Sequence, residues 1–488
     1  MNPFAPRTYG TLERVTDRVY LFRNVVNSAV VLGDAAVAVI DTQVNATMAA
    51  RLLQHIRTLS TQPLRYVINT HYHWDHTAGN AVFQQAGATI VSSARTREFM
   101  QTRAARQQAF LASRGFELGP LPILADETVC TSGALDLGNQ RLLLQCLGAA
   151  ETEDALAVHV PQEGCVLAGD TVMTGSFPVF GQPVMNEGLM GTDTWLNTLD
   201  QLAGLRPVHI LPGHGPVAHD ADLAFLKRLM RYFLDEVALR VAQHMPLPVL
   251  LADLEAHLPA WITAMPVVWG TPRYAILRVY RGLVEDGTGE PGWQHYKPSA
   301  IPAGEAGRVE MACATLTTLQ EFRQVAEEFE AGGDPGNAIA VARQATHVFS
   351  AVPAVWVFLS DCLLRGAQGV VSVLEKGDFF VEARQALQRA LRLDPHDATA
   401  HLALGRFLVM LAYRNGGDPR AGMAHLGQVI EQGLVPARGP QAALLAQAYF
   451  YTGMGHRTMG EEGQAMAHFK TALEHLPTFQ PARLAQQV

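Results

Sequence analysis

The sequence has few cysteines for a chain of 488 residues, and none of them belongs to a Cys-x-x-Cys pair. A disulfide framework needs cysteines in even number, and a thiolate zinc site needs them closely spaced. We therefore expect ordinary free thiols. The five cysteines are scattered along the chain, at Cys130, Cys146, Cys165, Cys313 and Cys362.

Long apolar runs and an excess of positive charge are also absent. The most apolar stretch, residues 19–41, is interrupted by Arg23, Asn24, Asn27 and Asp34, so it cannot form an uninterrupted membrane span of about 20 residues. The net charge of -8 and the lack of basic runs argue against nucleic acid as a partner. The first residues lack the charged start and apolar stretch of a signal peptide. We expect a cytoplasmic protein without a membrane span.

The order of apolar patterns indicates the fold class and the division into domains. Short β-branched runs such as 37–40 alternate with helical stretches up to about residue 220, which predicts an α/β fold with two mixed sheets between helical layers. The helical stretches include 46–59, about 77–85 and about 94–114. After residue 220 the patterns become helical, and Gly- and Pro-rich segments before residue 308 indicate a linker. We expect a first domain at 1–220, a helical extension and linker at 221–307, and a second domain at 308–488.

The C-terminal third contains a weak helical repeat. Residues 390–395 read Ala-Leu-Arg-Leu-Asp-Pro and are followed by small and apolar residues at helical spacing; a second copy ends at Pro477, 82 residues beyond Pro395. The pattern resembles the tetratricopeptide repeat, whose period of about 34 residues implies an insertion here. This resemblance implies an all-α repeat domain that binds partner proteins, mediates a homodimer or covers an active-site mouth.

The strongest chemical signal is the segment 70–76, which reads Thr-His-Tyr-His-Trp-Asp-His. His71 and His73 stand two apart on a loop that leaves a buried strand, so both side chains point the same way and can bind one metal ion. Asp75 and His76 follow at once and can serve a second ion. The aromatic residues between them, Tyr72 and Trp74, either form a pocket wall or pack beneath the loop.

Two later segments resemble the rest of such a site. Asp170 ends an apolar strand, which suits a carboxylate that bridges two metals, and His214 lies on the Gly-rich turn 212–216. Together with the segment 70–76 they resemble the metallo-β-lactamase superfamily. The resemblance implies an αββα sandwich, two Zn²⁺ ions and a supporting role for Asp41 beside the metal-binding loop, although a turn-capping role is the alternative for Asp41. An oxygen-rich site also tolerates Mn²⁺ or Fe.

The sequence departs from the superfamily where a further histidine ligand is usual. Here Gly148-Ala149-Ala150 is followed by Glu151-Thr152-Glu153, so Glu151 takes the vacant place, with Glu153 as the alternative and His159 a weaker one. A carboxylate can replace an imidazole as a zinc ligand at a similar distance. A glutamate at this position resembles the zinc alkylsulfatase branch, which differs in carrying Glu where this chain has Asp170.

This resemblance implies a function. We expect a binuclear hydrolase of small-molecule sulfate esters with an apolar group, in which Asp75 and Asp170 act in catalysis and a metal-bridging hydroxide is the nucleophile. The carboxylates of Glu151, Asp75 and Asp170 with one hydroxide would neutralise two zinc ions, so a sulfate ester needs further donors; Arg273 and Asn186 are candidates by position.

Three alternatives stay open at the level of sequence. A phosphotriesterase or phosphodiesterase and a lactonase would use the same metals, and a repeat-based scaffold would belong to another class. The segment 173–180 after Asp170 either lines an apolar pocket or packs in the core.

Overall fold

The structure is a computed structural model of the chain that describes residues 10–112, 118–181, 192–284, 301–370, 372–415, 417–432 and 440–486. These residues divide into two compact units, residues 10–284 and residues 301–486. Asn186, one of the two expected anion donors, lies outside the described residues.

The first unit is built on two β-sheets. In the seven-stranded sheet β1 to β4 are antiparallel neighbours and β4 to β7 run parallel, while in the five-stranded sheet only the pair β11 and β12 is parallel. The first sheet contains, in this order, β1 (Thr11–Arg14), β2 (Val19–Arg23), β3 (Ser28–Leu32), β4 (Val37–Ile40), β5 (Leu64–Ile68), β6 (Thr89–Ser93) and β7 (Glu127–Val129). The second contains β12 (His209–His214), β11 (Cys165–Met173), β10 (Ala155–Val160), β9 (Arg141–Gly148) and β8 (Ser132–Asp136).

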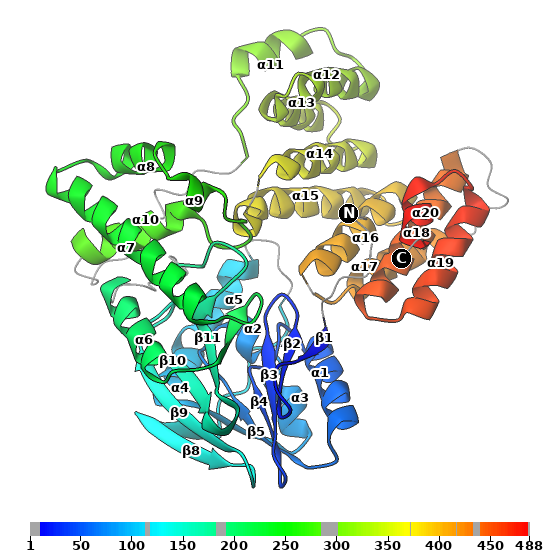
Figure 1. Ribbon diagram of the computed structural model, residues 1–488. Coiled ribbons are helices and arrows are strands. Elements are labelled where there is room, and N and C mark those ends of the chain that lie inside the picture. Colours follow the sequence, from blue (N-terminus) through cyan, green and yellow to red (C-terminus); the bar gives the residue numbers. More distant parts are fainter. Residues whose placement is uncertain are drawn as a thin grey trace. The chain divides into compact units, whose positions relative to one another are not determined.

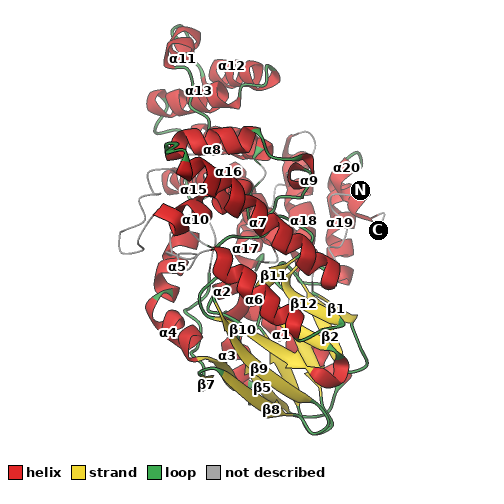
Figure 2. Cartoon of the chain, turned by 60° about the vertical axis from the view of Figure 1, so that its left-hand side comes forward, coloured by secondary structure: helices red, strands yellow, loops and turns green. Residues whose placement is uncertain are grey.

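The helices of the first unit cover the outer faces of these sheets (Figure 2). Asn45 caps the first of them by accepting from the backbone N–H of Met48, and Ser93 caps α4 in the same way. The helices are α1 (Ala46–Leu59), α2 (Trp74–Thr77), α3 (Asn80–Gln85), α4 (Ala94–Thr102), α5 (Ala104–Ala112), α6 (Thr192–Gly204), α7 (Asp220–Ala242), α8 (Leu247–Ala256), α9 (Ala260–Thr263) and α10 (Pro272–Val284).

Successive side chains of each strand point to opposite faces of its sheet, so the core consists of separate layers. Leu21 and Val31 point between the two sheets, where they meet Leu144 and Val158 of the second sheet. Their neighbours on the opposite face, among them Val30, pack against α1 and α3. The outer face of the second sheet packs against α6, α7, α8 and α10. This layering is the αββα sandwich that the sequence predicted.

The segment 220–284 belongs to the same hydrophobic core as the second sheet. Leu226 and Phe233 of α7, Leu250 of α8 and Ile276 of α10 form one buried cluster with Val166 of β11. The helical extension therefore packs on the second sheet, and α10 contacts the loop that precedes β10.

The second unit contains only helices among its described residues. Neighbours along the chain pack as hairpins, α12 on α13, α14 on α15, α16 on α17 and α18 on α19 (Figure 1). The helices are α11 (Ala306–Cys313), α12 (Leu319–Ala331), α13 (Pro335–Val348), α14 (Pro353–Gly366), α15 (Val373–Leu393), α16 (Ala398–Asn415), α17 (Arg420–Glu431), α18 (Pro440–Thr458), α19 (Glu462–His475) and α20 (Gln480–Gln486). This confirms a helical C-terminal region, while the assignment of individual tetratricopeptide repeats stays a prediction.

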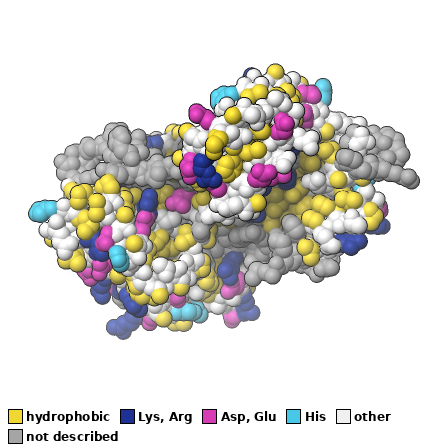
Figure 3. Space-filling view, turned by 90° about the horizontal axis from the view of Figure 1, so that it is seen from above, with side chains coloured by type: hydrophobic (Ala, Val, Ile, Leu, Met, Phe, Trp, Pro, Cys, Tyr) yellow, Lys and Arg dark blue, Asp and Glu magenta, His cyan; other side chains and the backbone are white. Residues whose placement is uncertain are grey.

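The surface carries charges of both signs, and the cysteines are unpaired, as the sequence led us to expect. On the face that Figure 3 shows, Lys and Arg side chains are interspersed with acidic and hydrophobic ones. All five cysteines are free thiols. In the part of the chain that the structure describes, no helix combines the length and the apolar character that crossing a membrane requires.

Candidate metal centre

The residues singled out in the sequence come from loops and strand ends of both sheets. His71 and His73 lie in the loop after β5, and Asp75 and His76 lie in the short helix α2. Asp170 lies within β11 and His214 ends β12, so the Gly-rich segment that was expected to be a turn is partly a strand. Because β11 and β12 are parallel neighbours, Asp170 and His214 reach the same edge of the second sheet.

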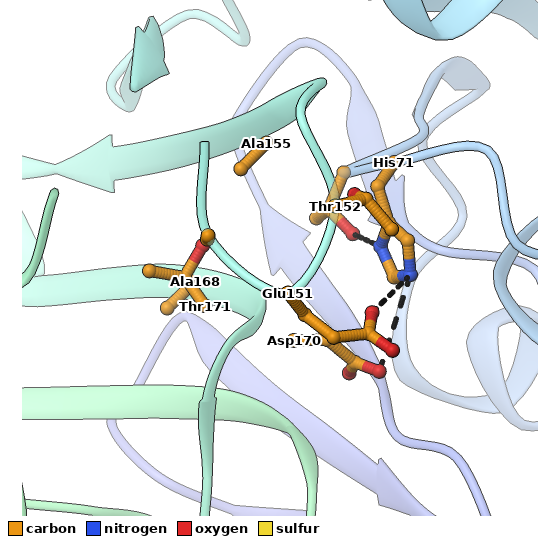
Figure 4. A pocket seen from close by; sticks show the side chains of 9 residues that line it. His71, Glu151, Thr152, Ala155, Ala168, Asp170 and Thr171 are labelled. Atoms are coloured by element: carbon orange, nitrogen blue, oxygen red, sulfur yellow. Dashed lines mark hydrogen bonds and ion pairs between the residues drawn. The ribbon is translucent and has the colours of Figure 1, made fainter. Parts of the chain in front are cut away.

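The first group consists of His71, His73, Glu151 and Asp170, whose ligand atoms all lie within 4.8 Å of one another. The carboxylate Oε2 of Glu151 lies 3.6 Å from Nε2 of His71 and 3.2 Å from Nδ1 of His73. Figure 4 shows the side chain of His71 pointing toward the carboxylates of Glu151 and Asp170. Two imidazoles and two carboxylates around one point are a donor set suited to a divalent metal.

The second group consists of Asp75, His76 and His214. Nε2 of His214 lies 3.4 Å from Oδ2 of Asp75, and Nε2 of His76 lies 3.7 Å from the same oxygen. Asp170 reaches both groups, since its Oδ2 is 3.9 Å from His71 and 3.3 Å from His214 while its Oδ1 is 3.4 Å from His76. The carboxylate of Asp170 therefore lies between the groups, as a bridging ligand must.

The structure distinguishes Glu151 from the two alternatives for the fourth donor of the first group. The carboxylate of Glu153 accepts a hydrogen bond of 3.1 Å from Arg103, and Glu153 does not join the metal-binding group. His159 lies in β10, five residues beyond the loop that carries Glu151, and does not join the group either. We therefore propose Glu151 as the candidate ligand at this position.

Asp41 holds the metal-binding loop from behind. Its carboxylate accepts hydrogen bonds of 2.8 Å from the backbone N–H and from the hydroxyl of Thr70, and its Oδ2 lies 2.8 Å from Nδ1 of His76. On the other side, Nδ1 of His214 lies 2.7 Å from the carbonyl oxygen of Val25. Both contacts leave Nε2 of each imidazole directed at the centre, which fixes the tautomer that can bind a metal.

The chemistry of the donor atoms fits two metal ions. Nε2 of His71, Nε2 of His76 and Oδ1 of Asp170 are buried and have no hydrogen-bond partner among the described residues. Such buried polar atoms are costly unless a ligand satisfies them. Burial, together with His76 and His73, holds the pKa of His71 well below its usual value, which favours the neutral imidazole that binds metals.

The carboxylates dominate the electrostatics of the second group. Burial alone would lower the pKa of His214, yet Asp170 and Asp75 raise it to about 10, and Asp170 and Asp41 also raise the pKa of His76 well above its usual value. His214 and His76 in turn hold the pKa of Asp170 well below its usual value, although burial acts in the opposite direction. The carboxylates of the second group therefore favour a positive charge beside them, carried either by protons on the histidines or by a metal ion.

Arg278 is a residue of the site that sequence reasoning missed. It is 4% exposed, and its guanidinium donates to the carbonyl oxygens of Ala150 at 2.6 Å and Glu151 at 3.2 Å. Thr198 donates to the preceding carbonyl, that of Ala149, at 2.6 Å. Three consecutive carbonyls of the loop that carries Glu151 are thus held from α6 and α10.

Tyr72 and Trp74 both line a small hollow with Pro120. Tyr72 is fully buried and packs edge to face on Phe99, whereas Trp74 is half-buried. Of the segment 173–180, Phe177 and Phe180 belong to the core.

Arg273 pairs with a carboxylate that belongs to neither candidate metal-binding group. Its guanidinium forms two hydrogen bonds to the carboxylate of Glu255, at 2.7 and 2.6 Å. Its charge is therefore offset by a carboxylate, so this residue is a poor donor for an anionic substrate.

Gly213 offers a direct test of the bridging position. A Cβ there would lie 1.9 Å from Oδ1 of Asp170 and 3.0 Å from Cε1 of His76. We expect Gly213→Ala to displace Asp170 and to lower metal affinity by at least about tenfold, measured by competition with a chelator. Gly204→Ala is the control, because nothing lies within 4 Å of a Cβ at that position. Unchanged metal affinity in Gly213→Ala would contradict the bridging role.

Comparison with known proteins agrees with this geometry. Residues 21–214 match the family model of the metallo-beta-lactamase superfamily. The stereoselective inverting sec-alkylsulfatase Pisa1 from Pseudomonas sp. is similar over 78% of this chain and 66% of its own, with 15% identity and a TM-score of 0.53. A double mutant of the same sec-alkyl sulfatase gives 16% identity over 77% of this chain and 65% of its own, with a TM-score of 0.54.

A metallo-beta-lactamase from Pontibacter korlensis is similar over 45% of this chain and 97% of its own, with 20% identity and a TM-score of 0.38. The likeness to Pisa1 concerns the fold, whereas the family match covers the segment that carries the metal-binding groups. Residues 21–214 of this chain therefore form a domain of the metallo-beta-lactamase superfamily.

Proposed function

We propose that this protein is a binuclear metal-dependent hydrolase that acts on sulfate esters with an apolar alkyl group. The observation that carries the proposal is Glu151, whose carboxylate joins His71, His73 and Asp170 where most of the superfamily has a histidine. The likeness in fold to a sec-alkylsulfatase over 78% of the chain supports the same substrate class.

Two metal ions would be held by the groups His71, His73, Glu151, Asp170 and Asp75, His76, His214. Bound there, they would polarise the ester and supply a water of lowered pKa as nucleophile. The protein's own part is to orient and to neutralise. Asp41 orients the imidazole of His76, and the Val25 carbonyl orients that of His214. The Asp170 carboxylate lies between the two groups, and Arg278 holds the backbone carbonyl of Glu151.

Charge sets the limit on the substrate. Three carboxylates and a hydroxide neutralise two divalent ions, so an anionic ester gains less attraction here than at a site with a histidine in place of Glu151. Arg278 adds one buried positive charge next to the first group, where its guanidinium bonds the carbonyl of Glu151 itself. The same count leaves a neutral phosphotriester or a lactone as the second candidate.

A substrate panel tests the proposal. The purified protein is loaded with Zn²⁺, Mn²⁺ or Fe²⁺, its metal content is measured by mass spectrometry, and hydrolysis of 2-octyl sulfate, a phosphodiester, a phosphotriester and a lactone is followed. We expect the highest kcat/KM with the alkyl sulfate and none without metal. A higher kcat/KM with the phosphotriester or lactone would replace the substrate class. No turnover of any ester at full metal occupancy would favour the scaffold.

A further inference from the structure

The second unit contains a large cavity between α14, α15, α16 and α18, with a volume of about 490 Å³. Its apolar wall is made by five side chains. Phe380 of α15 packs on Phe407 of α16 with ring centroids 5.6 Å apart, and Leu364, Met410 and Leu411 extend this surface. A volume of this size lies in the range of sites for small organic molecules, about 300–1,000 Å³.

Four basic side chains also line the cavity, and they are not equally compensated. Arg365 pairs with Glu330 at 2.8 Å, and Arg406 pairs with Asp361 at 2.8 Å. Lys376 and Arg414 form no ion pair with any acidic residue that the structure describes. Among the lining residues positive charge is therefore in excess, since Asp361 is the one carboxylate against four cations.

The two uncompensated cations lie close enough to repel each other. Burial, and after it the charge of Arg414, lower the pKa of Lys376 below its usual value. Lys376 comes from α15 and Arg414 from the C-terminal turn of α16, so the fold itself brings the like charges together beside an apolar wall. Two like charges side by side cost free energy that an anion between them would remove.

We propose that this cavity binds an organic anion with a single anionic head and an apolar chain, the head between Lys376 and Arg414 and the chain along Phe380 and Phe407. An inorganic anion would leave the apolar wall in water, and a neutral chain would leave the two cations uncompensated. Sulfate and carboxylate heads share this chemistry, so a fatty acid and an alkyl sulfate are the two sources. The proposal does not rest on the proposed hydrolysis.

Binding of four probes to the full chain tests the proposal. Decanoate and decyl sulfate, each below its critical micelle concentration, are titrated by calorimetry beside decanol and inorganic sulfate. We expect saturable binding of the two amphiphilic anions, and binding at least tenfold weaker for decanol and for sulfate. Decanoate cannot be hydrolysed, so its binding is independent of any ester hydrolysis. Tighter binding of one anion than of the other identifies which head the cavity prefers.

The variant Lys376→Gln with Arg414→Gln locates the site. It should weaken decanoate binding at least tenfold, whereas Arg392→Gln, which removes an exposed charge of α15 outside the cavity, should leave binding unchanged. The variant Leu411→Trp, which adds bulk to the apolar wall, should also weaken it. The proposal is overturned if decanoate does not saturate, if the double variant binds as tightly as the unchanged protein, or if an acidic peptide binds there more tightly than decanoate.

Discussion

Replacing Glu151 with glutamine is expected to remove one of the two metal ions and most of the activity. Glu151 is 2% exposed, and its Oε2 lies 3.2 Å from His73 and 3.6 Å from His71, so the amide would place a weak ligand in the middle of the first group. Loss of a residue that merely supports a metal ligand costs roughly 10–100-fold in affinity or activity, and a direct ligand should cost more. Metal content by mass spectrometry and kcat/KM check this.

Two further variants make this result specific. Glu153→Gln is the matched control, because Glu153 is also buried and lies in the same loop but pairs with Arg103. It should keep both metals. Glu151→His restores the usual ligand of the superfamily and should keep both metals while it raises the charge of the site by one. Retention of two metals in Glu151→Gln, or their loss in Glu153→Gln, would show that the ligand is assigned to the wrong residue.

The Glu151→His variant also separates two parts of the proposed function. If Glu151 only holds the metal, the variant should hydrolyse all esters of the panel in the same order as before. If the near-neutral charge sets the substrate class, the added positive charge should lower KM for the anionic alkyl sulfate more than for a neutral lactone. Steady-state kinetics on these two substrates distinguish the cases.

The clustering of these candidate ligands could be predicted from the sequence because metal sites often take their donors from short segments. His71, His73, Asp75 and His76 come from six consecutive residues, and the structure places two of them in each candidate group. The preference for Glu151 over Glu153 rested on the resemblance to the superfamily and not on donor chemistry. The two residues stand two apart in one loop, and the structure separates them, because Oε2 of Glu151 lies 3.2 Å from His73 whereas Glu153 accepts from Arg103.

The fold could be predicted where strands consist of β-branched runs and less well where breaks depend on tertiary contacts. The run 37–40 is a buried strand, and the helix 46–59 has the predicted bounds. The helix expected at 94–114 is instead divided into α4 and α5 at Arg103, whose guanidinium lies 3.5 Å from the ring centroid of Phe99 and bonds Glu153. The helix expected at 77–85 begins only at Asn80, as α3, and the separate short helix α2 before it contains Asp75 and His76.

The burial of Arg278 could be predicted from the sequence, but its hydrogen-bond partners could not. It stands in the apolar run Ala275-Ile276-Leu277-Arg278-Val279 of α10, and a charge in such a run indicates a buried ion with polar partners. Its acceptors, the carbonyls of Ala150 and Glu151, are backbone atoms some 127 residues earlier in the chain. No side-chain pattern marks a carbonyl as an acceptor, so the partner could not be named without the structure.

Replacing Arg278 with lysine is expected to destabilise the protein and to weaken metal binding by the first group. A hydrogen bond to a charged donor contributes about 1.5–3 kcal/mol, and lysine cannot reach both carbonyls in the fork geometry of a guanidinium. Lysine also loses part of the contact with Trp195, whose ring centroid lies 4.9 Å from Cζ of Arg278. We expect the free energy of unfolding to fall by at least about 2 kcal/mol, measured with urea.

Metal affinity then separates a positioning role from a purely structural one. In the folded Arg278→Lys variant, well below its unfolding midpoint, the first metal should bind more weakly, and excess metal should restore part of kcat, which it should not do for Glu151→Gln. Arg273→Gln is the control on the same helix, because its partly exposed pair with Glu255 should contribute about 1 kcal/mol or less. If Arg278→Lys lowers stability but binds both metals with unchanged affinity, Arg278 stabilises only α10, and Thr198 alone suffices to hold the loop of Glu151.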